Sequence, residues 1–196
     1  MIPRVRFVIS SIALAAIVAV AAGSDTFHPG PASDYAHQTS ELVTIGAKSF
    51  GTAPEIAGVF GKKVDLLKYG VLPVLVVIEN KRQKTIDLRD LEVNLVAVDG
   101  RHATPVNPED VMFLGTNGRR PREIPSPIPL PGKKNPLNAP EIITRAFSAK
   151  VLPPGDSSAG FFYFQAKPEQ GDSLYVNGLR DTPSEKEIMY FEFAIK

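Results

Sequence analysis

The chain has 196 residues, of which 43% are hydrophobic, a formal net charge of +1 and no cysteine. The lack of cysteine excludes disulfides, thiolate metal sites, a thiol nucleophile and a lipidated N-terminal cysteine. The near balance of 22 basic and 21 acidic residues gives no sign of a nucleic-acid partner.

Residues 1–22 have the organisation of a secretory signal peptide. Arg4 and Arg6 precede an uncharged apolar run over 7–22, and the small residues Ala19 and Ala21 offer a cleavage site. The run is shorter than the roughly 20 residues that a membrane-spanning helix needs. We therefore expect an exported protein, periplasmic or secreted. Membrane contact is expected only if the segment stays uncleaved as an anchor.

Residues 23–40 are rich in Ser, Asp, Pro, Gly, His and Thr and contain few apolar residues. Such a composition buries too little apolar surface to offset the entropy of ordering. We predict a flexible tether over 23–40, followed by a single β-sandwich domain over 41–196.

The first part of this domain is predicted to contain a strand and one short helix. Alternating apolar and polar residues predict a strand over 42–48. Thr52 lies three positions before Glu55, with Pro54 between them, which is typical of a capped helix start. Two glycines soon afterwards indicate that this helix is short.

The clearest strand is predicted over 71–79, where a nearly unbroken run of Val, Leu and Ile requires both faces to be covered. Pro73 is placed near its entrance, where a missing N–H does least harm. A half-buried strand is predicted over 91–97, and the Asp99-Gly100 pair predicts the turn that ends it.

Four further strands are predicted over 145–152, 160–166, 174–179 and 189–195. Residues 161–164 are all aromatic, so this strand is expected to lie between two apolar layers. Gly178 indicates either a bulge or, with Asn177, a turn. The last strand is expected to belong to the core.

Seven or so short strands separated by Gly, Pro and Asp turns, without a long helix, are typical of an antiparallel sandwich. The predicted fold class is all-β: an antiparallel immunoglobulin-like β-sandwich with one short helix and a long Pro-rich loop.

Three local patterns carry a resemblance to a known group of domains. They are the valine-rich strand that ends in Asn80, the Asp99-Gly100 turn, and the Pro154-Gly155 turn before the aromatic strand. Together they resemble immunoglobulin-like domains of exported bacterial proteins of unknown function, over residues 71–196. The resemblance implies a sandwich and no catalytic residues. The chain departs from this pattern in an insertion between residues 114 and 145.

The insertion over 115–140 is basic and contains seven prolines. The prolines exclude a helix or an inner strand and favour extended polyproline II segments. One interpretation is a semi-rigid arm for an anionic partner, and the other is a solvated connection. The candidate partner-binding residues of the arm are Arg119, Arg120, Arg122, Lys133 and Lys134.

Other candidate chemistry has a simpler interpretation. Of the three histidines, His28 and His37 fall in the predicted tether, and His102 is expected to be a surface turn residue. Asp87, Asp90 and Glu92 are expected to form an exposed face rather than an acid/base pair. The aromatic residues 161–164 could line a sugar or lipid groove, but core packing is preferred. We expect no catalytic residues, metal or cofactor.

These observations favour an exported, non-enzymatic binding module that contacts a protein or an anionic cell-envelope component through loops and edge strands. One alternative is a structural accessory subunit of a cell-envelope assembly. The other is a hydrolase, which the sequence favours least because the required residues are missing or unpaired.

Overall fold

A computed structural model describes residues 27–114, 135–182, 184–188 and 190–195. The predicted signal peptide over 1–22 lies outside these ranges, as does most of the basic insertion. None of the helices in the described ranges is long and apolar enough to span a membrane.

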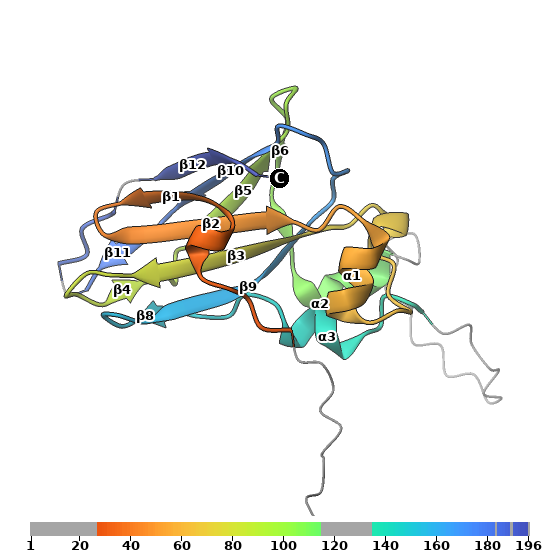
Figure 1. Cartoon of the computed structure of the whole chain (residues 1–196), viewed down its shortest axis with the longest axis horizontal. Helices are drawn as coiled ribbons and strands as arrows, with labels where there is room; N and C mark the ends of the chain where they lie inside the picture. Colours follow the sequence, from red (N-terminus) through yellow and green to blue (C-terminus); the bar gives the residue numbers. More distant parts are fainter. Residues whose placement is uncertain (1–26, 115–134, 183, 189, 196) are drawn as a thin grey trace, which may run out of the picture.

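The main sheet has five strands, in which neighbouring strands pair antiparallel (Figure 1). Its order across the sheet is β1 (Ala36–Ser40), β2 (Val43–Ser49), β3 (Leu72–Asn80), β9 (Ser157–Phe164) and β7 (Pro105–Val106). The long β3 is central and pairs with β2 on one side and β9 on the other. This confirms the predicted central strand.

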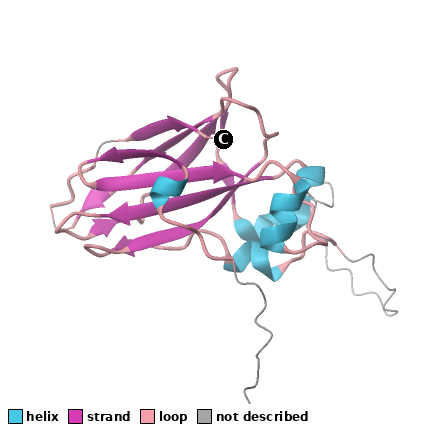
Figure 2. Cartoon of the chain, in the orientation of Figure 1, coloured by secondary structure: helices cyan, strands magenta, loops and turns pink. Residues whose placement is uncertain are grey.

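Two smaller antiparallel sheets complete the strand architecture (Figure 2). One has the order β12 (Phe191–Ala194), β10 (Ser173–Asn177), β5 (Glu92–Val96) and β6 (His102–Ala103), and we call it the second sheet. The other has the order β11 (Arg180–Asp181), β4 (Ile86–Asp87) and β8 (Val151–Leu152). The mainly-β, antiparallel class predicted from the sequence is confirmed.

A first apolar core lies between the main and second sheets. Alternate residues of β3, among them Val74, Val76 and Ile78, face this core and are fully buried. The second sheet contributes Leu174 and Phe191 to it, and both are fully buried. The C-terminal strand β12 therefore belongs to the core, as the alternation of its residues predicts.

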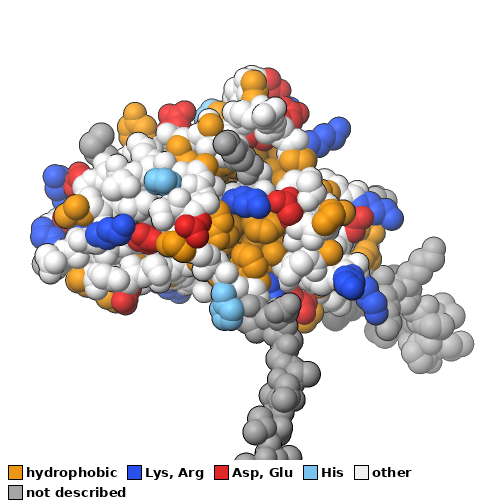
Figure 3. Space-filling view, in the orientation of Figure 1, with side chains coloured by type: hydrophobic (Ala, Val, Ile, Leu, Met, Phe, Trp, Pro, Cys, Tyr) orange, Lys and Arg blue, Asp and Glu red, His pale blue; other side chains and the backbone are white. Residues whose placement is uncertain are grey.

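A second apolar core covers the opposite face of the main sheet. It packs β3 and β9 residues such as Leu75 and Tyr163 against three helices, α1 (Ala53–Phe60), α2 (Pro108–Leu114) and α3 (Pro140–Thr144). Hydrophobic side chains also gather at the surface where the strands meet the helices (Figure 3). Because both faces of β3 are buried, its sequence is a continuous apolar run rather than an alternating one.

The expectation of one short helix is wrong, because the described residues contain three α-helices and two 3₁₀ helices, η1 (Ala32–Asp34) and η2 (Leu67–Tyr69). Only α1 was predicted, and its Thr52 cap is confirmed: the Thr52 hydroxyl oxygen accepts the Glu55 N–H at 3.5 Å, and the same hydroxyl donates to Glu55 Oε2 at 2.8 Å. Helices α2 and α3 have seven and five residues. Helices this short have too few residues to show a clear 3.6-residue period.

The tether prediction over 23–40 is wrong for the described residues 27–40, which form η1 and β1. Ala32 is fully buried, and its N–H donates to Glu79 Oε1 at 2.8 Å. A Cβ at Gly46 would lie 2.2 Å from the Ala32 carbonyl oxygen, so the glycine permits this segment to cross β2 closely. Strand β1 pairs with β2 through backbone hydrogen bonds, which do not require an apolar sequence.

The strand predicted over 145–152 is mostly wrong. Only Val151–Leu152 forms a strand, β8, and Ala146 makes an isolated bridge to Phe161. Helix α3 ends at Thr144, directly before this segment. The Tyr163 hydroxyl fixes α3 to the main sheet, because it donates to the Ile142 carbonyl at 2.7 Å. Burial in this second core raises the pKa of Tyr163.

Candidate functional site

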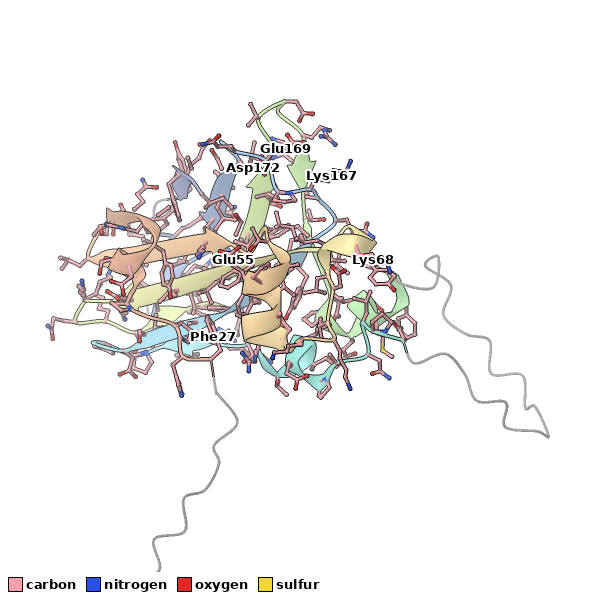
Figure 4. The ribbon with its side chains drawn as sticks, turned by 45° about the vertical axis from the view of Figure 1, so that its right-hand side comes forward. Phe27, Glu55, Lys68, Lys167, Glu169 and Asp172 are labelled. Carbon is pink, nitrogen blue, oxygen red and sulfur yellow. The ribbon has the colours of Figure 1, made fainter. Side chains whose placement is uncertain are left out.

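A groove of about 700 Å³ lies where the second sheet meets the helical layer. Its walls come from the β5–β6 hairpin, the β9–β10 loop and the end of η2. We call it the polar groove. Figure 4 labels Lys167, Glu169 and Asp172 on the β9–β10 loop, beside this hairpin. The groove's lining residues include Tyr69, Leu95, Ala97, Arg101, His102, Ala103, Gln165, Ala166, Lys167, Glu169 and Asp172.

The β5–β6 hairpin forms one wall and has the turn that the sequence predicts. Gly100 has a φ of +81°, a left-handed conformation that favours glycine. Its N–H donates to the Ala97 carbonyl at 2.8 Å, and Arg101 Nε donates to Asp99 Oδ2 at 2.6 Å. The Arg101 guanidinium holds the pKa of Asp99 below its usual value. These contacts present Arg101 and the adjacent His102 at the groove.

Asp172 forms the foot of the opposite wall and is only 3% exposed. Its Oδ2 accepts the Glu169 N–H at 3.2 Å, and its backbone carbonyl accepts the Ile195 N–H at 2.8 Å. Its Oδ1 is buried and has no hydrogen-bond partner among the described residues. A buried oxygen without a partner costs about 1–3 kcal/mol, and because this atom is closed off from solvent it is not itself a contact point for a partner.

The upper part of the groove combines polar side chains with a small apolar floor. Within the described residues, no hydrogen bond or ion pair engages the side chains of Tyr69, His102, Gln165, Lys167 or Glu169. The apolar lining residues, which we call the floor, are Leu95, Ala97, Ala103 and Ala166. The groove therefore presents unpaired donors and acceptors beside apolar surface, which suits a partner with both kinds of group.

The basic partner-binding residues predicted from the sequence, Arg119, Arg120, Arg122, Lys133 and Lys134, lie outside the described residues. Their role as an arm for an anionic partner stays a prediction. The end of the insertion is described: Asn135 and Asn138 lie in the approach to α3, and Pro140 is the first residue of that helix.

The histidines are separated in the structure. His102 is exposed in β6, as expected of a surface turn residue, and it lines the polar groove. His37 belongs to β1 rather than to a tether, and its Nδ1 lies 2.9 Å from the Tyr35 carbonyl. No group of three or more His, Asp or Glu residues in the described ranges is arranged to hold a metal ion.

Two of the three acidic residues near β4, Asp87 and Asp90, form ion pairs with arginines. Arg89 binds both carboxylate oxygens of Asp87 through Nε, at 3.0 and 2.9 Å, and lowers the pKa of Asp87 to about 2. Asp90 lies 3.5 Å from Arg180, and Glu92 is exposed. None of these contacts joins two carboxylates as an acid/base pair would.

The aromatic residues 161–164 lie in the cores. Phe161 packs in the second core against Phe27, Phe50 and Phe60, with ring centroids 5.7, 5.2 and 5.0 Å away. Phe164 is fully buried in the first core. The preferred interpretation of these residues as core is confirmed.

Sequence reasoning missed the polar groove. Its residues come from three segments that are far apart along the chain, and only the Asp99-Gly100 turn carries a recognisable pattern. Between the strands predicted over 160–166 and 174–179, the sequence from Lys167 to Asp172 contains no motif that indicates a binding site.

No protein-family model matches the sequence, and no curated protein matches it. Three solved bacterial structures are similar to the chain. The ycdA protein of Bacillus subtilis subsp. subtilis str. 168, described as a candidate lipoprotein, has a TM-score of 0.40 and 11% identity, covering 82% of this chain and 38% of its own. The chain thus spans less than half of that protein.

The second is the secreted protein MPT63 of Mycobacterium tuberculosis, with a TM-score of 0.35 and 14% identity, covering 83% of this chain and 95% of its own. The third is a DUF4426 family protein of Pseudomonas aeruginosa PAO1, with a TM-score of 0.32 and 11% identity, covering 80% and 89%. All three TM-scores are below 0.5, so these likenesses identify neither a family nor a function for this chain.

Proposed function

We propose that the chain is an exported, non-enzymatic, immunoglobulin-like binding module that contacts a protein of the cell envelope through the polar groove. The observation that carries this proposal is a set of groove side chains that make no hydrogen bond or ion pair with the described residues: Tyr69, His102, Gln165, Lys167 and Glu169. Export is supported by the signal-peptide organisation of residues 1–22.

The groove is better suited to contact than to catalysis. A histidine that acts as a general base is usually oriented by a hydrogen bond to an acid. His102 makes no such bond with the described residues, and Asp172 is already held by the Glu169 N–H. Unpaired polar side chains around an apolar floor instead match the composition of a protein interface.

The edge strands offer less to a partner than the loops do. At one edge of the sandwich, Gln38 of β1 bridges to β12, because its Oε1 accepts the Glu192 N–H at 2.7 Å. At the other edge of the main sheet, β7 has two residues, one of which is Pro105. Short strands, proline and covered edges all hinder strand addition. The proposal therefore assigns contact to the groove loops.

The test is quantitative capture of a partner from a cell-envelope fraction by the purified mature protein. A Lys167→Ala/Glu169→Ala variant removes two exposed groove side chains. We expect about tenfold weaker binding, because losing interface contacts worth about 1.4 kcal/mol has that effect.

The matched control is Lys150→Ala/Glu192→Ala, which also removes one cation and one anion from exposed positions, but outside the groove. It should bind as the wild type does. Equal binding by both variants would contradict the groove assignment. A stoichiometric, salt-insensitive complex unaffected by the groove variant would favour the structural accessory subunit instead.

A further inference from the structure

A second cavity, of about 760 Å³ and open to solvent, lies at the surface of the helical layer. One wall is the C-terminal end of α1 and the loop after it, residues 60–64. The other wall is the approach to α3, from Asn135 to the first turn of the helix. None of its lining residues belongs to the polar groove. The volume falls in the range of about 300–1,000 Å³ that is typical of small-molecule sites.

The interior of this cavity is apolar and firmly supported. Phe60 and Val64 form one side and are 1% and 8% exposed. The Phe60 ring packs against Phe161 and Tyr163 of the main sheet, with centroids 5.0 and 6.1 Å away. Ala139 lies on the opposite wall together with Pro136 and Pro140. Phe60 is held by these ring contacts, so this wall is formed before a ligand arrives.

The mouth of the cavity is positively charged. Lys62 and Lys63 are both exposed, and neither forms an ion pair with a described residue. Glu141 is the one acidic residue among the described lining residues. The Asn135 side chain is held by the protein, because it donates to the Met112 carbonyl and accepts the Leu137 N–H. Two cations against one anion favour a negatively charged group at this mouth.

We propose that this cavity binds one long-chain fatty acid, with the hydrocarbon chain against Phe60, Val64 and Ala139 and the carboxylate beside Lys62 and Lys63. An apolar interior next to two unpaired cations is complementary to a molecule that has one apolar chain and one anionic end. A neutral apolar ligand would leave the lysines unused. The fatty-acid site does not depend on the function proposed for the polar groove.

Binding is tested with the full mature protein, using the fluorescence of cis-parinaric acid and its displacement by palmitate. Palmitate should compete, and hexadecanol, which has the same chain but no charge, should compete about tenfold less well. Palmitate binding should weaken as the salt concentration rises.

Two charge variants and one filling variant locate the site. Lys62→Glu/Lys63→Glu should weaken palmitate binding about tenfold, whereas Lys150→Glu/Lys186→Glu, at exposed positions away from the cavity, should leave it unchanged. Glu141→Gln should strengthen binding about twofold, because it removes the opposing charge. Ala139→Phe should abolish binding while circular dichroism and the unfolding midpoint show a folded protein.

The proposal is overturned if palmitate does not displace the probe. It is also overturned if hexadecanol competes as well as palmitate, or if palmitate binding survives both the charge reversal and Ala139→Phe. Envelope-partner capture by the groove is measured separately with the Lys167→Ala/Glu169→Ala variant, so failure of one site is distinguishable from failure of the other.

Discussion

At the residue scale, Gly178 is fixed by two independent constraints. Its φ of +80° lies in the left-handed region, where a side chain causes strain. A Cβ there would also lie 1.9 Å from the Asp90 carbonyl oxygen. The residue follows β10 and precedes β11, so it lets the chain pass closely beside the start of β5.

We predict that Gly178→Ala lowers the free energy of unfolding by about 3 kcal/mol, because backbone strain and overpacking add. The control is Gly58→Ala within α1, where no atom lies within 4 Å of the added Cβ. This control should raise stability by about 0.5–1 kcal/mol through helix propensity. Urea denaturation measures both. Equal effects of the two variants would contradict the close approach at Gly178.

The carboxyl of Asp87 is a second residue whose behaviour follows from one contact. Arg89 lowers its pKa from the ordinary value of 3.8 to about 2. Because the pKa is lower in the folded protein, the ion pair stabilises the fold above pH 4 and loses its effect as the pH falls through about 2. The contribution to stability is small, since the Arg89 side chain is exposed to solvent.

We predict that Arg89→Gln raises the pKa of Asp87 toward its ordinary value. A pH titration of the Asp87 side-chain carboxyl carbon by NMR measures this shift. Arg180→Gln is the control, because Arg180 is a weaker influence on the same carboxyl. The account of this contact fails if the Asp87 titration is unchanged in the Arg89 variant.

At the element scale, β3 and β9 are strands with two buried faces. Phe162 and Phe164 of β9 turn to the first core, while Phe161 and Tyr163 turn to the second. A strand covered on one side only would alternate apolar with polar residues. The apolar runs over 74–78 in β3 and 161–164 in β9 therefore indicate that a further layer, here the helices, covers the outer face of the main sheet.

The C-terminal strand β12 closes one edge of the second sheet and completes the first core. We predict that Phe191→Ala, at a fully buried position, lowers the free energy of unfolding by about 3–5 kcal/mol. Tyr190→Ala is the neighbouring control: this side chain is 53% exposed and stacks on Tyr175 at 5.4 Å. Its loss should cost about 1 kcal/mol. Thermal unfolding that ranks the two variants the other way would contradict the position of β12.

The sequence predicts elements well where one local rule dominates. The apolar run of β3, the Thr52 cap and the Asp99-Gly100 turn each have such a rule, and each is confirmed. The β1–β2 hairpin has none: its turn residues Glu41 and Leu42 have φ values of +47° and +63°, a conformation usually supplied by Gly or Asn.

The candidate sites could not be predicted from local sequence patterns, because their residues come from separate segments of the chain. The polar groove joins the end of η2, the β5–β6 hairpin and the β9–β10 loop, which only tertiary pairing brings together. Asp172 looks like an ordinary loop residue in the sequence. Its burial becomes visible only once β12 is paired to β10 and the Ile195 N–H binds its carbonyl.

At the scale of the whole molecule, three layers give the chain two different ends. Away from the helices, the buried Asn80 amide donates to the carbonyls of Lys84, Leu152 and Pro153 at 2.8, 3.0 and 3.0 Å. Nearby, Arg82 Nη2 lies 2.8 Å from the Asp181 carboxylate. These polar groups are paired within the protein and fix the connections between strands.

The other end contrasts with this paired network. There, the polar groove has side chains that are unpaired among the described residues, and the adjacent helical layer carries the apolar cavity, which is open to solvent. Binding groups placed on loops above a rigid sandwich are a common arrangement in β proteins. This division of the molecule supports the proposal of a binding module.

We expect the polar groove to be the surface that contacts a partner. Site-specific photocrosslinking in the producing cells tests it most directly, with the photoreactive residue placed at His102 in the groove or at Val151, which is 51% exposed in β8. We expect a discrete crosslinked adduct from position 102 and none from position 151. An adduct from position 151 alone, or no adduct from position 102, would contradict it.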